Sequence, residues 1–194
     1  MEEIRHKLVT VGDTGVGKSS VIWSCLVCEN HQVFRGGPTI GAAYFSCRIG
    51  NTRLQIWDTA GQERFRSLYG MYYRNSSFCV CVFDVSNRES FESVDRWLAL
   101  FRESCPGVPY LLVANKIDSL KWVVTRQEIE EKAKSLTCGV VFTSAITGEN
   151  REELRNIVKE DCDSRNTQDL KDAIQLFDPP RETYGTCQPS QCTT

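Results

Sequence analysis

The chain has 194 residues, a formal net charge of −2, a pI of about 5.8 and 41% hydrophobic residues. This length suits one domain with a tail, and the near-neutral charge gives no reason to expect nucleic acid or an anionic membrane as a main partner. The charged N-terminus lacks the apolar core of a signal peptide, and no apolar run approaches the ~20 residues that a membrane span needs. We therefore expect a cytoplasmic protein that reaches a membrane only through an attached lipid.

The ten cysteines are best explained as core residues. Cys79 and Cys81 alternate within the apolar run 78–83, and Cys25 lies in a second apolar stretch. Cysteines in such runs behave as small hydrophobic residues in a reducing compartment. Cys25 and Cys28 have CxxC spacing, but no second pair follows and the chain has two histidines, so a zinc site is disfavoured.

Strands and helices are predicted to alternate along the chain. Strands are predicted at 7–11, 43–49, 53–57, 78–85, 110–114 and 140–143, and helices at 18–28, 90–103, 125–136 and 150–161. Gly50 and Asn51 indicate a tight hairpin, and Thr125 with Glu128 forms a capping box that opens a helix. The alternation predicts an α/β fold, with a six-stranded, mostly parallel sheet that has one antiparallel strand and helices on both faces.

The C-terminal part of the chain differs in composition from the rest. We expect one domain over residues 1–165, an extra helix over 166–177 and a flexible tail over 178–194. Apolar side chains between 170 and 177 recur at helical spacing, with Thr167 as a plausible N-cap. The tail is rich in Pro, Gly, Ser, Thr and Gln, a composition that predicts flexibility.

The most specific motif follows the first predicted strand. The segment from Gly12 to Ser19 matches G-x-x-x-x-G-K-[ST] between a strand and a helix, the context that identifies a phosphate-binding loop. Its backbone N–H groups and the helix N-terminus favour anions. Lys18 is predicted to bridge the β- and γ-phosphates, and Ser19 to bind Mg²⁺. The predicted contacts of the loop are Asp13, Thr14, Gly15, Val16, Gly17, Lys18, Ser19 and Ser20.

A second motif, Asn115-Lys116-Ile117-Asp118, predicts that the base is guanine. It follows a strand at the edge where such sheets bind ligands. Asp118 can accept hydrogen bonds from two donors that adenine lacks, which can give a selectivity of roughly 10⁴. We expect Asn115 to support the loop and the Lys116 stem to cover the ring face. An ATP-dependent kinase is disfavoured by Asp118 and by the lack of an arginine-rich lid.

Two further segments predict switching and hydrolysis. Asp58 can hold Mg²⁺ through water, the Gly61 amide can meet the γ-phosphate, and Gln62 can orient the attacking water. Thr39 can bind Mg²⁺ through its hydroxyl and the γ-phosphate through its amide, so that loss of this phosphate releases its loop. The predicted metal ligands are therefore Ser19, Thr39 and Asp58.

These motifs resemble those of the Ras superfamily of small GTPases and, within it, the Rab family. The similarity covers about residues 4–160, and the runs 54–68 and 71–74 are its most specific parts. Residues 39–43 and 71–74 look most like endocytic Rabs. The resemblance implies a P-loop NTPase G domain that binds GTP, GDP and Mg²⁺, hydrolyses GTP slowly without an activating protein, and regulates vesicle traffic at the cytosolic face of endomembranes.

The resemblance also implies a set of partner proteins. A guanine-nucleotide exchange factor, a GTPase-activating protein and effectors are expected to act on a monomer. Effectors of the family read an aromatic triad, which corresponds here to Tyr44, Trp57 and Tyr72. The alternative is that these aromatic side chains are simply core.

Two departures from the family pattern bear on function. The segment Ser144, Ala145 and Ile146 is expected beside the base, but Ile146 replaces the family's lysine, so we expect retained binding with faster nucleotide exchange. Cys187 and Cys192 do not form a C-a-a-X box. They are candidates for atypical prenylation with the help of prenyl-binding escort proteins, and an unmodified tail is the alternative. These departures leave open a GTP-binding scaffold or interaction module with little intrinsic hydrolysis.

Overall fold

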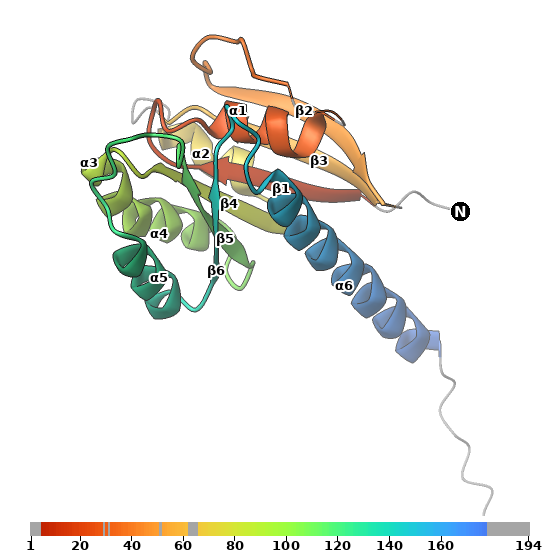
Figure 1. The fold of residues 1–194 in the computed structure, drawn as a ribbon. Helices are drawn as coiled ribbons and strands as arrows, with labels where there is room; N and C mark the ends of the chain where they lie inside the picture. The colour runs from red at the N-terminus through yellow and green to blue at the C-terminus, as the bar shows by residue number, and fades with distance from the viewer. Residues whose placement is uncertain (1–4, 29, 31, 51, 62–65, 178–194) are drawn as a thin grey trace, which may run out of the picture.

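The computed structural model describes residues 5–28, 30, 32–50, 52–61 and 66–177, without side-chain detail at 66–67 and 166–177. Six strands form one sheet in the order β2-β3-β1-β4-β5-β6 (Figure 1). The β2–β3 pair is antiparallel, and the other neighbouring pairs are parallel. The predicted α/β fold is confirmed.

The strands are β1 (Arg5–Val11), β2 (Ala42–Ile49), β3 (Thr52–Thr59), β4 (Phe78–Asp84), β5 (Tyr110–Asn115) and β6 (Gly139–Thr143). The helical segments are α1 (Lys18–Val21), η1 (Ile22–Val27), α2 (Arg66–Tyr73), α3 (Arg88–Glu92), α4 (Val94–Ser104), α5 (Arg126–Ser135) and α6 (Arg151–Phe177). All six predicted strands are found, with ends that differ from the predictions by at most two residues. The predicted capping box is also confirmed, since Thr125 and Glu128 exchange both of its hydrogen bonds at the start of α5.

Several helices differ from the predictions. The expected helix at 18–28 changes from α to π winding at Ile22, and the amide of Cys28 donates to Trp23 O at 3.0 Å. The expected helix at 90–103 is divided at Ser93 into α3 and α4. The extra helix predicted at 166–177 is not separate, because α6 continues without a break to Phe177. An ion pair between Arg165 and Asp161, one helical turn apart, bridges the place where a break was expected.

The sequence reasoning missed α2 altogether. Gly70 and three tyrosines give this segment little intrinsic preference for a helix. Tyr69 and Tyr73 lie four residues apart and are 3% and 0% exposed, so α2 buries one face against the body of the protein. Tertiary packing therefore stabilises a helix that its local sequence does not predict.

The sheet separates two hydrophobic cores. One face packs against α2, α3, α4 and α5, and the other packs against α1, η1 and α6 (Figure 1). Cys79 and Cys81 are buried in the first core and Cys25 in the second, as the sequence predicted. Because β1, β3, β4, β5 and β6 are parallel, the loops that follow them gather at one edge of the sheet.

Candidate functional site

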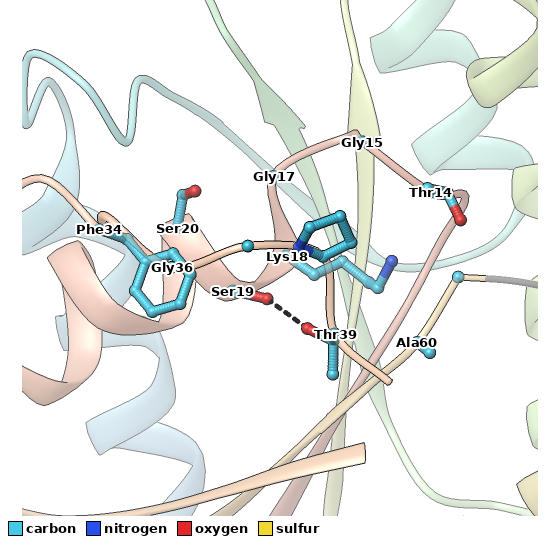
Figure 2. Close-up of a pocket in the computed structure, with 13 residues that line it drawn as sticks. Thr14, Gly15, Gly17, Lys18, Ser19, Ser20, Phe34, Gly36, Thr39 and Ala60 are labelled. Atoms are coloured by element: carbon cyan, nitrogen blue, oxygen red, sulfur yellow. Dashed lines mark hydrogen bonds between the residues drawn. The ribbon is translucent and has the colours of Figure 1, made fainter. Parts of the chain in front are cut away.

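The loop between β1 and α1 lines a cavity of about 240 Å³ (Figure 2). Two of its glycines are required by close contacts. Gly12 has a φ of +137°, and a Cβ there would lie 2.1 Å from Val82 O. Gly17 has a φ of +96°, and a Cβ there would lie 2.4 Å from the Asn115 amide nitrogen. Both positions need glycine, because a side chain there would be strained and would clash with these neighbours.

Residues from three segments surround this cavity. Thr14, Gly15, Gly17, Lys18, Ser19 and Ser20 line it from the loop, Phe34, Gly36, Gly37, Pro38 and Thr39 from the segment before β2, and Ala60 and Gly61 from the end of β3. The ring of Phe34 also packs against Trp23, with 6.2 Å between centroids. Val16 is buried beneath the loop in the second core. Six of the eight predicted loop residues therefore line one cavity, whereas Asp13 and Val16 do not.

Lys18 is 6% exposed, and its ammonium donates to Gly12 O at 2.9 Å and to Asp13 O at 2.8 Å. Burial lowers the pKa of Lys18 to about 8, against the opposing influence of Asp58 and Asp13. Lys18 is therefore mostly charged at neutral pH, and its side chain extends along the loop toward Thr14 (Figure 2). This places a cation where the phosphates of a nucleotide are expected.

The three predicted metal ligands meet beside the loop. Ser19 Oγ lies 2.9 Å from Thr39 Oγ1, as Figure 2 shows, and it donates to the Asp58 carboxylate. Thr39 Oγ1 donates to the same carboxylate oxygen at 3.1 Å. The other oxygen of Asp58 accepts a bond from Thr10 Oγ1 at 2.9 Å, and Asp58 is fully buried. Three segments of the chain therefore place hydroxyl oxygens around the single carboxylate of Asp58.

Asn115 and Lys116 connect the end of β5 to the phosphate-binding loop. The Asn115 amide donates to Val16 O at 2.8 Å, and the Lys116 ammonium donates to Gly15 O at 2.8 Å. Lys116 also pairs with Asp84, which ends β4, at 2.6 Å. The Asn115 side chain thus bonds directly to the loop, in line with the support role predicted for it, and the Lys116 ammonium is held by both Gly15 and Asp84.

Asp118 is held by the segment after β6. Ser144 Oγ donates to Asp118 Oδ1 at 2.6 Å and accepts from the amides of Ile146 and Thr147 at 3.2 and 3.0 Å. The Ala145 amide, which was expected to approach the base, donates to Asn115 Oδ1 at 3.2 Å. Ile146 is 58% exposed. Asp118 is therefore oriented by Ser144, and the exposed Ile146 lies two residues after Ser144 and donates its amide to the same hydroxyl.

The predicted aromatic triad also comes together. The ring centroids of Tyr44 and Trp57 are 5.6 Å apart, and those of Trp57 and Tyr72 are 5.9 Å apart. Tyr44 is 50% exposed, whereas Trp57 and Tyr72 are partly buried against the first core. The triad thus forms one surface that spans β2, β3 and α2, and its two inner members also serve as core.

Some predicted residues lie outside the described part of the chain. These are Gln62, the candidate for orienting water, and the candidate lipidation sites Cys187 and Cys192. Gly61, next to Gln62, is described and lies tightly against the phosphate-binding loop, because a Cβ there would be 2.4 Å from the Asp13 carbonyl carbon.

Sequence reasoning missed several residues of the site. Thr10 and Asp84 lie at or near the ends of parallel strands, and the edge rule applied to the strand at 78–85 would have pointed to Asp84. Arg96 and Trp97 on α4 also contact the phosphate-binding loop, at Asp13. Trp97 has the spacing of a core residue on a helix. The sequence around it therefore predicts its burial but not its hydrogen bond to Asp13.

Residues 7–163 match the Ras family. A probable Rab-related GTPase of Acanthamoeba polyphaga mimivirus is 45% identical over 153 residues, which cover 75% of this chain and 70% of the viral protein. Ras-related protein Rab-31 of Homo sapiens is 40% identical over 154 residues, 76% of this chain and 78% of the human protein. GTP-binding protein ypt5 of Schizosaccharomyces pombe is 35% identical over 159 residues, 78% of this chain and 74% of the yeast protein.

Proposed function

Because the chain belongs to the Ras family of small GTPases, as a Rab-type member, we propose that it cycles between GTP and GDP to control a step of vesicle traffic. Its reaction is the hydrolysis of GTP to GDP and phosphate. The switching role rests on how the segment before β2 reaches the phosphate site, and the choice of nucleotide rests on the segments after β5 and β6.

The contact of Thr39 with Ser19 and Asp58 carries this proposal. Thr39 lies 20 residues after Ser19, on a loop without regular structure, and its hydroxyl joins these two buried or half-buried residues. The Ala60 amide also donates to Gly41 O at 2.8 Å, which ties this loop to the end of β3. Both loops therefore meet where the γ-phosphate is expected, and loss of that phosphate removes a contact that they share.

The residues at this point fit Mg²⁺. Mg²⁺ prefers oxygen ligands and is usually held by one or two carboxylates together with substrate phosphates. Ser19, Thr39 and Asp58 present hydroxyl and carboxylate oxygens within 3.1 Å of one another. Bound there, Mg²⁺ supplies neutralising charge to the β- and γ-phosphates. Lys18, which lines the same cavity, adds a second positive charge.

Guanine is selected by Asp118 in this proposal. Its carboxylate accepts from the two guanine donors while Ser144 fixes its rotamer, and Lys116 lies against one face of the base. The selection is efficient because an adenine would leave the carboxylate without partners. Phe34, which already lines the cavity, supplies an apolar ring for the ribose or the base.

Hydrolysis requires an attacking water in line with the γ-phosphate, and we assign the orientation of this water to Gln62. In-line phosphoryl transfer depends on positioning and charge neutralisation more than on a strong base, so a neutral glutamine suffices. Single-turnover hydrolysis with Mg²⁺ tests the assignment, with Gln62→Leu as the comparison. We expect slow turnover in the wild type and a clear loss in the variant. Equal rates would favour the alternative hypothesis of a GTP-binding scaffold or interaction module with little intrinsic hydrolysis.

The membrane part of the proposal rests on the family and on the tail. No helix in the described part of the chain is both long and apolar enough to cross a bilayer. We propose that Cys187, Cys192 or both are prenylated, and that the lipid holds the protein on an endomembrane. Mass spectrometry of the protein from its native cell tests this, and two unmodified cysteines would exclude it.

Effectors are proposed to bind the surface of Tyr44, Trp57 and Tyr72. This surface adjoins both loops that meet at Thr39, so its shape depends on the bound nucleotide. Proteins captured by the GTP-locked Gln62→Leu form, but not by the same form with Tyr44→Ala, would identify the effectors and the transport step. Equal capture by both forms would place the effector site elsewhere.

A further inference from the structure

The carboxylate of Asp13 is held from outside the nucleotide cavity by helix α4. Asp13 Oδ1 accepts from Trp97 Nε1 at 2.8 Å and from Arg96 Nη2 at 3.0 Å. The same residue uses its carbonyl oxygen to accept the Lys18 ammonium. Asp13 therefore joins the phosphate-binding loop to α4 through its side chain and to Lys18 through its backbone.

Of the two donors on α4, Trp97 is the one whose position is fixed. Its side chain is packed in the first core, with 2% exposure, whereas the Arg96 side chain is 46% exposed. Exposed ion pairs contribute little because water screens them and the side chains lose freedom. A hydrogen bond from a buried indole to a carboxylate is stronger, since the acceptor is charged and the donor has no freedom to lose.

The contacts of Trp97 continue into α2 and return to the cavity. Its ring packs on Tyr69, with 5.4 Å between centroids, and the Tyr69 hydroxyl donates to Ala60 O at 3.2 Å. Ala60 precedes Gly61, which lies against the backbone of Asp13. These five residues form a closed ring of contacts around the end of β3, and two of them, Ala60 and Gly61, line the cavity.

We propose that Trp97 is a positioning residue for GTP hydrolysis, which acts by holding Asp13 and Tyr69 at the distance that sets Gly61 against the phosphate-binding loop. Trp97 does not reach the nucleotide. Its effect passes through the peptide unit of Gly61, whose amide is the expected contact of the γ-phosphate. Because GDP lacks this phosphate, loss of the ring of contacts should weaken GTP hydrolysis and GTP binding far more than GDP binding. This inference rests on the proposed GTP switch and adds a residue to it.

Three substitutions test this ring of contacts, and a fourth substitution serves as a matched control. Trp97→Phe keeps an aromatic ring against Tyr69 and removes the indole N–H. Asp13→Ala removes the acceptor, and Tyr69→Phe removes the bond to Ala60. The control is Tyr73→Phe, which deletes a buried hydroxyl from the same aromatic cluster, where Tyr73 stacks on Tyr69, but makes none of the contacts of the ring.

Trp97→Phe and Asp13→Ala should slow single-turnover hydrolysis by about 10-fold, the loss expected for one hydrogen bond to a charged group. Tyr69→Phe should slow it by roughly 2- to 10-fold, because the bond it removes is to the neutral carbonyl of Ala60. The double variant Trp97→Phe with Asp13→Ala should be no slower than either single variant, because both remove the same bond. Release of GDP from Trp97→Phe and Tyr69→Phe should change by less than about 2-fold, and the control should match the wild type. Asp13→Asn, which retains an acceptor oxygen, should recover most of the rate.

Two results would overturn the proposal. One is wild-type hydrolysis in Trp97→Phe. The other is a parallel loss of hydrolysis, GDP binding and thermal stability in all test variants, which would mean that Trp97 is only a core residue.

If the wild-type protein does not hydrolyse GTP, the proposed GTPase activity is wrong. The ring of contacts around Trp97 can then still be tested by NMR. The indole N–H signal of Trp97 is the one that disappears in Trp97→Phe. In the wild type, its chemical shift should differ between the protein loaded with GDP and the protein loaded with a non-hydrolysable GTP analogue. An identical signal in both states would refute the inference independently of turnover.

Discussion

Removal of one hydroxyl, in Ser144→Ala, should release the nucleotide faster. Ser144 is fully buried, donates to Asp118 at 2.6 Å and accepts from two backbone amides. Without it, Asp118 loses the bond that fixes its rotamer, and the turn after β6 loses the acceptor for the amides of Ile146 and Thr147. The guanine donors then meet a mobile carboxylate.

The size of the effect follows from these contacts. A hydrogen bond to a charged group contributes about 1.5–3 kcal/mol. We take the lower end, about 1.5 kcal/mol, because Asp118 is exposed in the structure and water partly replaces the lost donor. Since 1.4 kcal/mol corresponds to a factor of 10, release of GDP should be roughly 10-fold faster in Ser144→Ala.

The assay is the release of a fluorescent GDP analogue into an excess of unlabelled GDP. Ser119→Ala is the matched control, because Ser119 lies next to Asp118 in sequence and its hydroxyl accepts only from the exposed amide of Lys121, at 3.3 Å, among the bonds of this loop. Release from Ser119→Ala should equal that of the wild type. Equal release from Ser144→Ala and the wild type would refute the reasoning that Ser144 orients the base-binding carboxylate.

Three further outcomes are expected. Ile146→Lys should slow GDP release by about 2- to 12-fold, the range for one added contact of roughly 0.5–1.5 kcal/mol. A rate equal to that of the wild type would contradict the role given to Ile146. The pKa of Lys18 is lowered to about 8 without phosphates, and phosphates raise it, so GDP binding should take up protons at pH 8.5 and weaken as the pH rises through 8. Calorimetry at pH 8.5 in two buffers of different ionisation heat measures this uptake, and equal heats would disprove it. Thr125→Ala removes the capping-box hydroxyl of α5 and should cost about 1 kcal/mol, a fall in melting temperature of roughly 2–4 °C by calorimetry, with GDP release unchanged. An unchanged melting temperature would mean that this cap contributes no stability.

Features that depend on near neighbours along the chain could be predicted from the amino-acid sequence. The phosphate-binding loop is recognisable because its glycines, Lys18 and Ser19 act within eight residues, and the capping box at Thr125 acts within four. Strand periodicity and the hairpin at Gly50 likewise sufficed for the sheet and its one antiparallel pair. The loop, the capping box and the hairpin turn are each made by residues close together in sequence. Strand periodicity shows which side chains are buried, so a strand can be recognised before its distant partner is known.

Features that join distant segments became visible only in the folded protein. Helix α2 exists because Tyr69 and Tyr73 are buried against α4, which outweighs the weak helical preference of a segment containing Gly70. Trp97 and Asp13 are 84 positions apart in the sequence, and no sequence pattern around either residue predicts their hydrogen bond. A tryptophan on a helix is favoured in the core by its large apolar surface whether or not its N–H finds an acceptor. Only packing shows that this one points its N–H at the phosphate-binding loop.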